Sequence, residues 1–212
     1  MNIRKQQKTN FAAIYPFAPD WEEFQHLNLD KKFFHFEKHV LNSQQEYARA
    51  KHISDELEIC LITAPESIFS PKGRDSFRNY TYSYSELKRF EEKVKQLQSQ
   101  LNPDTFVIAG AIDYATPDLK HYMVTTYAVT KDKIHTYDKI KATEKMHETY
   151  IVQENKKTKA SLKMHSRKKC GLFTFKNKII GLEICQDHEE ATLLNNKVSV
   201  DIHVVISAGQ TI

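Results

Sequence analysis

The sequence predicts a layered α/β domain in which helices cover buried β-sheets. Short apolar runs at 57–64 and 105–112 have the length of strands that are buried on both faces, and between them 83–101 repeats its apolar residues at helical spacing. With 212 residues, 40% of them hydrophobic, the chain is long and apolar enough for one core. We predict a loose polar segment at 1–10 and a single domain over 11–212.

The domain is predicted to begin with a strand and to continue with a helix. Residues 11–17 have the apolar and aromatic content of a short strand, which Pro16 and Pro19 end. The stretch 21–36 mixes aromatic with charged residues and fits no single period, so it receives no assignment beyond a helical tendency. Apolar residues in 36–51 fall roughly on one face and predict a helix.

The clearest helix of the sequence spans 83–101. Ser83 and Glu86 have the spacing of a capping box at its start, and Asn102 with Pro103 supplies a stop. Between these signals the apolar positions recur every three or four residues, at Leu87, Phe90, Val94, Leu97 and Leu101.

The second half of the chain is predicted to consist mainly of strands. Polar turns separate two pairs of apolar runs, as expected for β-hairpins. The predicted elements are a strand at 105–112, hairpins at 121–129 with 133–139 and at 172–175 with 179–184, and a final strand at 201–206.

Composition argues against several classes of protein. Three cysteines, an odd number, imply no disulfide framework and favour a reducing compartment, so we expect a cytoplasmic protein. The sequence has no signal-peptide pattern and no apolar stretch of ~18 residues, so we expect no membrane partner. With only 5 glycines it has neither a GxGxxG nor a GxxxxGK[ST] loop, and no HExxH motif is present. We therefore predict neither a cofactor nor a metal ion.

Three ionisable residues stand at the ends of predicted strands, where side chains from separate strands can converge on one pocket. Glu66 follows the first buried run and Pro65, Lys139 ends the first hairpin, and Cys185 follows 179–184. The residues are far apart in the chain, so only the tertiary fold could bring them together.

Cys185 has the most informative surroundings. Asp187 and Glu190 have the D-x-x-E spacing of a helix start, and with Asp187 as N-cap the helix N-terminus would lower the pKa of the thiol and favour a nucleophile. The alternatives are ordinary ones. Cys185 would then pack as a small hydrophobic residue, Glu66 would be an exposed carboxylate in a turn, and Lys139 a solvated lysine.

Taken together, the three segments resemble the nitrilase, or carbon–nitrogen hydrolase, superfamily. The resemblance rests on Pro65-Glu66, on Tyr137-Asp138-Lys139, and on the apolar strand that leads through 181–187 with its cysteine. It extends to the strands at 107–110 and 205–208. Gln186 departs from it, because family members often have an aromatic residue there.

The resemblance implies roles for these residues. Cys185 would be the nucleophile that forms a thioester with the substrate, and Glu66 the general base. Lys139 and the backbone N–H of Gln186 would stabilise the oxyanion. A second glutamate often supports such a site.

Two glutamates could fill this supporting position. Glu148 is the candidate, with Glu144 as its rival.

The resemblance also implies a fold and partners. It implies an αββα sandwich, a small amide or nitrile substrate with an amide preferred, a homo-oligomer and no cofactor. Only residues 186–212 follow the cysteine, fewer than the family's fold uses, so we expect the sandwich to be incomplete at its C-terminal end. Either partner chains cover the bare sheet, or the protein is a truncated or degenerate member.

A basic segment at 155–169 supplies a second functional hypothesis. It contains seven Lys or Arg residues and no acidic residue, within a chain of net charge +4. Without interleaved aromatic residues, a solvated loop is a better interpretation than a nucleic-acid site. The alternative to the enzyme is a catalytically inactive, nitrilase-like binding protein that uses this loop as its contact surface.

Overall fold

The computed structural model describes residues 11–71, 81–140, 150–154, 159–164, 166, 171–189, 193 and 199–207. In chain order the elements are β1 (Ala12–Pro16), α1 (Trp21–Phe24), α2 (Leu29–Ile53), β2 (Ile59–Thr63), the 3-10 helix η1 (Glu66–Phe69), α3 (Tyr84–Ser99), β3 (Thr105–Ala115), β4 (His121–Val129), β5 (Ile134–Asp138), β6 (Tyr150–Glu154), β7 (Lys159–Met164), β8 (Leu172–Phe175), β9 (Lys178–Ile184), α4 (Gln186–Glu189) and β10 (Ile202–Ile206). Every strand predicted from the sequence is present.

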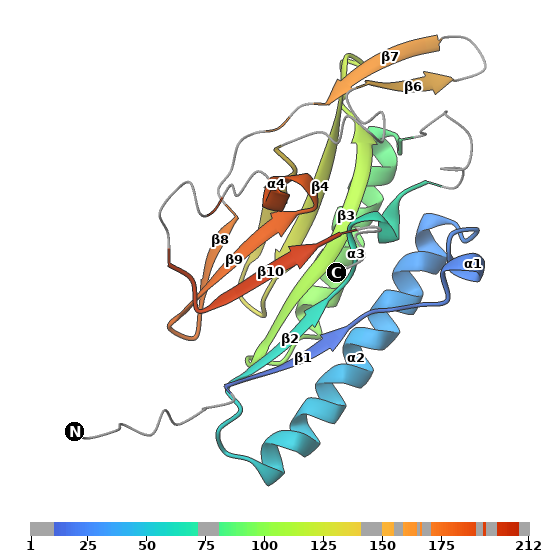
Figure 1. Cartoon of the computed structure of the whole chain (residues 1–212). Coiled ribbons are helices and arrows are strands. Elements are labelled where there is room, and N and C mark those ends of the chain that lie inside the picture. Colours follow the sequence, from blue (N-terminus) through green and yellow to red (C-terminus); the bar gives the residue numbers. More distant parts are fainter. Residues whose placement is uncertain are drawn as a thin grey trace.

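These strands form two sheets (Figure 1). The first has the order β1-β2-β3-β4-β7-β6, and β5 also pairs with β4. β1, β2 and β3 are parallel, and β4 with β5 forms the predicted antiparallel hairpin. The second sheet has the order β10-β9-β8, in which β9 and β10 are parallel, so both end at the same edge.

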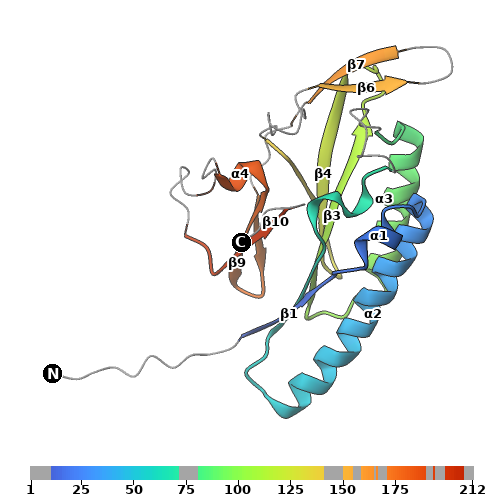
Figure 2. The ribbon, with the colours of Figure 1, turned by 45° about the vertical axis from the view of Figure 1, so that its right-hand side comes forward.

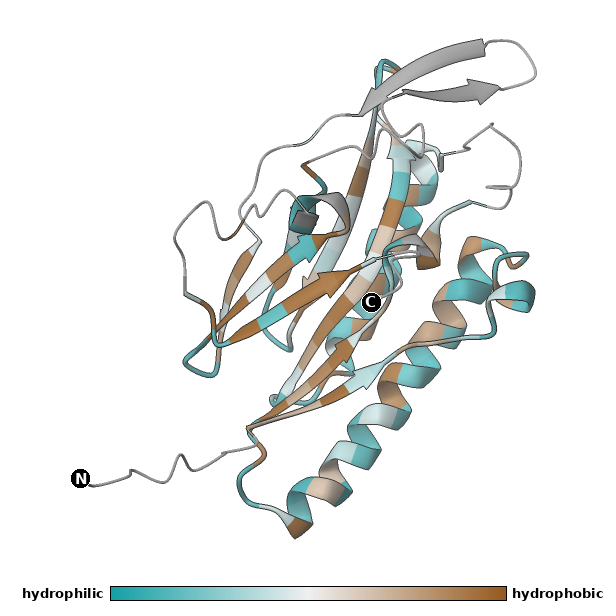
Figure 3. Ribbon diagram, viewed as in Figure 1, coloured by the Kyte–Doolittle hydropathy of each residue, from teal (hydrophilic) through white to brown (hydrophobic). Residues whose placement is uncertain are grey.

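The elements stack in three layers, which Figure 2 shows from the side. α2 and α3 cover one face of the first sheet, and the second sheet packs against the other face. β2 illustrates why its sequence is continuously apolar: Cys60 and Ile62 pack toward the helices, whereas Ile59 and Leu61 pack toward the second sheet. Hydrophobic residues accordingly run along the strands of both sheets (Figure 3). The predicted layered α/β class is confirmed.

The observed helices agree only in part with those predicted from the sequence. In α3 the predicted capping box is present, since Ser83 and Glu86 each accept a hydrogen bond from the other's backbone N–H. The unassigned stretch 21–36 contains α1 and the first two turns of α2, which Asn28 caps by accepting a 2.9 Å hydrogen bond from the N–H of Lys31.

The basic segment is only partly a loop. Its residues 159–164 form β7, which pairs with β6, so the prediction of a loop is wrong for this part. A run of lysines separated by small and apolar residues alternates well enough to form a strand. The remaining residues 155–158, 165 and 167–169 lie outside the described residues, as do 1–10.

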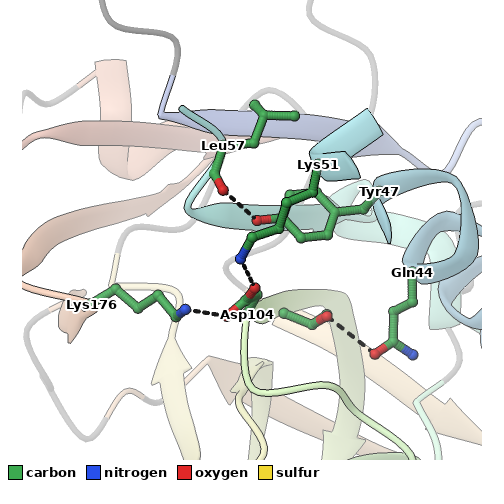
Figure 4. Close-up of polar contacts among 7 residues, drawn as sticks. Gln44, Tyr47, Lys51, Leu57, Asp104 and Lys176 are labelled. Atoms are coloured by element: carbon green, nitrogen blue, oxygen red, sulfur yellow. Dashed lines mark hydrogen bonds and ion pairs between the residues drawn. The ribbon is translucent and has the colours of Figure 1, made fainter. Parts of the chain in front are cut away.

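Asp104 ties the three layers together (Figure 4). Its carboxylate accepts from the Nζ atoms of Lys51 on α2 and Lys176 in the β8–β9 turn. Burial would raise the pKa of Asp104, but the hydrogen bonds and positive charges of the two lysines outweigh burial and lower it. Beside it, Tyr47 donates to the carbonyl of Leu57 at 3.1 Å.

Candidate active site

Glu66 opens η1, directly after β2 and Pro65, and its side chain is buried. The backbone of this turn lies against β3 at Gly110. A Cβ atom at Gly110 would overlap the carbonyl oxygen of Pro65 and the Cγ2 atom of Ile68, so only glycine allows the turn to approach this closely. The position of Glu66 therefore depends partly on Gly110, which lies 44 positions further along the chain.

Lys139 follows β5 and is completely buried. Its backbone N–H donates to the carbonyl of Val124 at 2.9 Å, which continues the β4–β5 pairing by one residue. Its Nζ atom donates to Oε1 of Glu66 at 2.7 Å. The structure thus brings together two predicted site residues that lie 73 positions apart, as a buried ion pair.

The residue before Lys139 is also held in place. Asp138 is fully buried, and its Oδ1 atom accepts a 2.7 Å hydrogen bond from the hydroxyl of Thr125, which is buried on β4. Fixing the end of β5 in this way restricts the backbone from which the lysine projects.

Cys185 directly follows β9 and lies in the left-handed region of backbone conformation, with φ of 45°. This conformation is strained for a residue other than glycine and is often found at functional sites. Its N–H donates to the carbonyl of Ile206 on β10 at 2.9 Å, and its carbonyl accepts from the N–H of His188 at the same distance. The side chain is buried in the cluster between the two sheets, which also contains Tyr137.

Asp187 is not the N-cap that the sequence predicts. It is the second residue of α4, a helix of four residues that begins directly after Cys185. Its buried carboxylate accepts from the hydroxyl of Tyr137 at 2.8 Å and from the N–H of Ile140 at 3.0 Å. These long-range hydrogen bonds occupy oxygens that the D-x-x-E pattern assigned to the helix start.

Asp187 therefore connects two of the predicted site segments. Tyr137 and Ile140 flank Lys139, whereas Asp187 lies two residues beyond Cys185. The lysine, the glutamate paired with it and the cysteine segment belong to one hydrogen-bonded unit. Sequence analysis missed this role of Asp187, because its hydrogen-bond partner Tyr137 lies 50 positions away in the chain.

A pocket of about 310 Å³ opens beside this unit. Its described lining comes from 16–19, Trp21, 63–65 and 205–207, at the ends of β1, β2 and β10. It borders Pro65, which precedes Glu66, and Ile206, which holds the backbone of Cys185. The hydroxyl of Ser207 in this lining is buried and has no hydrogen-bond partner among the described residues.

The remaining predicted site residues are not described in the same detail. Gln186 is the first residue of α4, and the oxyanion role of its backbone N–H stays a prediction. Glu148 and its rival Glu144 lie outside the described residues. Their supporting role stays a prediction.

A second polar cluster lies on β9 beside the cysteine, and sequence analysis missed it. The buried carboxylate of Glu183 accepts from the N–H of Leu193 at 2.7 Å and lies 2.8 Å from one ring nitrogen each of His188 and His203. Burial would raise the pKa of Glu183, but these hydrogen bonds outweigh burial and lower it. The sequence signal that could have identified this cluster is Glu183 itself, a carboxylate inside an otherwise apolar strand.

Comparisons with known proteins support the fold. No family model and no curated protein matches the chain. Among solved structures it is similar to the glutamine-dependent NAD+ synthetase from Acinetobacter baumannii in complex with ADP, with 16% identity and a TM-score of 0.57 over 93% of this chain and 32% of that one. The corresponding enzyme from Cytophaga hutchinsonii gives 15% identity and a TM-score of 0.50 over 86% and 29%.

Nit3 from Saccharomyces cerevisiae, a member of branch 10 of the nitrilase superfamily, gives 16% identity and a TM-score of 0.46 over 82% of this chain and 60% of that one. The chain spans about a third of the length of the two synthetases. The predicted α/β class is confirmed, with the described residues in three layers, and the fold is similar to that of the two synthetases. That it is a nitrilase-like αββα sandwich stays a prediction. None of the described helices combines the length and apolar character needed to cross a membrane.

Proposed function

We propose that this protein is a cysteine-dependent carbon–nitrogen hydrolase that cleaves a small amide through a thioester intermediate. The observation that carries the proposal is the buried pair of Lys139 and Glu66, 2.7 Å apart. Burying two charges is costly, and a pair of this kind is a weak way of gaining stability. Its position, coupled through Asp187 to a strained cysteine beside a pocket, favours a role in chemistry.

The proposed reaction begins with proton transfer from the thiol of Cys185 to the carboxylate of Glu66. The sulfur attacks the amide carbon, a C–S bond forms and the carbonyl electrons move to oxygen. When the tetrahedral intermediate collapses, the C–N bond breaks and the proton from Glu66 goes to the leaving nitrogen. Water then attacks the thioester and passes a proton to Glu66, which returns it to the thiolate as the C–S bond breaks.

Stabilisation of the oxyanion is assigned to Lys139 and the N–H of Gln186. The lysine is completely buried, so its charge acts at low effective dielectric and needs no reorganisation during the reaction. Because the same ammonium is paired with Glu66, it also holds the general base in position.

An amide remains the preferred substrate, ahead of a nitrile. Two of the similar structures are glutamine-dependent NAD+ synthetases, so glutamine is the first primary amide to assay. The hydroxyl of Ser207 in the pocket could accept from, or donate to, an amide group. A homo-oligomer is proposed on the family resemblance alone.

The first experiment measures alkylation of each cysteine by iodoacetamide as a function of pH, followed by peptide mapping. We expect Cys185 to react fastest near neutral pH. Cys60 is a matched internal control, because burial raises the pKa of its thiol to about 12. In Glu66→Gln the rate at Cys185 should fall, while Cys60 stays unreactive.

The second experiment measures ammonia release from glutamine and a panel of primary amides. Cys185→Ala should abolish the release while the far-ultraviolet circular dichroism spectrum stays unchanged. If Cys185 in the folded wild type reacts no faster than Cys60, the hydrolase proposal fails. The inactive binding protein, with segment 155–169 as its contact surface, then becomes the better hypothesis.

A further inference from the structure

The cluster around Glu183 has the composition of a metal site. Oε2 of Glu183 lies 2.8 Å from Nδ1 of His188 and 2.8 Å from Nε2 of His203. The three potential ligand atoms lie within 4.8 Å of one another. They come from three elements, β9, α4 and β10, so their convergence is a product of the tertiary fold rather than of a local sequence motif.

The two carboxylate oxygens of Glu183 have different partners. Oε1 accepts the backbone N–H of Leu193 at 2.7 Å, which fixes the orientation of the carboxylate. Oε2 is left facing the two imidazoles. Metal-binding carboxylates are commonly held by such a second hydrogen bond, which orients the remaining oxygen as a single ligand.

The site also has access to solvent and room to adjust. Glu183 is 1% exposed, whereas the side chains of His188 and His203 are 48% and 36% exposed. Around a tetrahedral zinc ion, ligand atoms at 2.0–2.1 Å from the metal lie ~3.3 Å apart. Each imidazole nitrogen would therefore move about half an ångström away from Oε2 of Glu183, which partly exposed rings can do. Solvent could complete the coordination.

We propose that Glu183, His188 and His203 form a binding site for a divalent transition-metal ion of the zinc class, with water in the open position. Two imidazoles and one carboxylate suit Zn²⁺ and its neighbours, whereas Mg²⁺ and Ca²⁺ prefer oxygen ligands. The site is separate from the thiol of Cys185, which packs in the cluster between the sheets together with Leu182 and Ile184. Glu183 alternates with these two residues along β9, so its side chain lies on the other face of the strand.

A metal ion here would stabilise the backbone of the cysteine turn. β9 ends directly before Cys185, α4 begins directly after it, and the carbonyl of Ile206 on β10 accepts its N–H. These are the three elements that supply the ligands. The site does not depend on the proposed hydrolase activity, because binding can be measured without a substrate.

The test is calorimetric titration of the chelator-treated full chain with Zn²⁺, together with the visible absorption spectrum of its Co²⁺ form. We expect one Zn²⁺ per chain and a Co²⁺ spectrum of low coordination number without a thiolate charge-transfer band. His188→Ala and His203→Ala should each weaken binding by more than the roughly 10–100-fold that loss of an outer-shell partner costs. Both histidines are partly exposed, so both variants should fold.

Two matched controls define the site. His121→Ala removes a histidine that lies 3.6 Å from the carboxylate of Asp118, outside the proposed site, and should leave Zn²⁺ affinity unchanged. Cys185→Ala should bind Zn²⁺ like the wild type. Affinity that survives in both histidine variants, is lost in Cys185→Ala, or is absent in the wild type would overturn the proposal. The Co²⁺ spectrum of the wild type gives an independent answer if a variant does not fold.

A second readout follows the cysteine turn itself. Saturation with Zn²⁺ should slow amide hydrogen exchange in 183–189 and 202–206 of the wild type. It should leave exchange in these segments unchanged in His203→Ala. Slowing of equal size in both proteins would place the metal elsewhere.

Discussion

Tyr137 donates its hydroxyl hydrogen bond to Asp187 at 2.8 Å, and this contact joins the lysine segment to the cysteine segment. Both residues are buried. Tyr137 lies two residues before Lys139 and Asp187 two residues after Cys185, so a displacement of either segment strains the same hydrogen bond. A residue pair outside the proposed chemistry thus controls the relative position of two proposed catalytic groups.

Tyr137→Phe tests this coupling. Loss of a buried hydrogen bond to a carboxylate should lower the free energy of unfolding by about 2 kcal/mol, as measured by urea denaturation. It should also slow alkylation of Cys185. Tyr127→Phe is the matched control, since its hydroxyl donates to Glu91 at 3.2 Å on the side of α3. The control should leave the alkylation rate unchanged, and equal slowing in both variants would contradict the coupling.

A double-mutant cycle on Lys139 and Glu66 tests their energetic dependence. Lys139→Met removes the cation that donates to Glu66 at 2.7 Å and leaves a buried carboxylate, so unfolding should become easier by about 4 kcal/mol. The double variant Lys139→Met with Glu66→Gln should recover part of this loss. Urea denaturation of the four proteins gives the coupling energy.

The control for this cycle is Lys95 with Glu92, a pair at the same 2.7 Å whose side chains are both more than half exposed. Solvent screens such a pair, so its coupling should be much smaller than that of the buried pair. Similar coupling energies in the two cycles would show that burial adds nothing to the interaction of Lys139 with Glu66.

Local signals in the sequence predicted most of the elements but not all of their limits. The capping box of α3 was predictable because Ser83 and Glu86 lie three residues apart. The start of α2 was not, because Phe33 is buried, while Phe34 beside it is 61% exposed. An aromatic residue on the solvent side blurs the apolar stripe from which a helix is recognised.

The candidate site was predictable as far as residue identity and strand ends allowed. Glu66, Lys139 and Cys185 could be selected because each stands at the end of a predicted strand and the three segments together resemble a known family. The partners of Asp187 and Glu183 could not, since hydrogen bonds across 50 and 20 positions depend on how the strands pair. Local pattern favoured an N-cap at Asp187, and the tertiary fold overrode it.

Asp104 predicts a specific dependence of stability on pH. The two lysines lower its pKa below the ordinary value of 3.8 in the folded protein, so its stabilising contribution is fully present above that pH. The contribution is lost as the pH falls through the lower, folded-state pKa. The difference in the free energy of unfolding between the wild type and Asp104→Asn should therefore shrink below about pH 4.

Urea denaturation at a series of pH values measures this difference. Lys176→Met, which removes one of the two cations, should show a smaller pH dependence than the wild type and a larger one than Asp104→Asn. A difference between wild type and Asp104→Asn that stays constant across the acid range would contradict the role of the two lysines.

Gly110→Ala tests whether the turn before Glu66 must approach β3 closely. The added methyl group would overlap the carbonyl oxygen of Pro65 and the side chain of Ile68, so the turn must move away from the strand. We expect a loss of about 1–3 kcal/mol in the free energy of unfolding. Because Glu66 follows Pro65, the pH dependence of Cys185 alkylation should also become like that of Glu66→Gln.

Ala111→Gly, which removes a methyl group from the next residue of β3, should destabilise the protein without this change in alkylation. If Gly110→Ala lowers stability but leaves the alkylation profile of the wild type, Glu66 does not depend on this contact for its position.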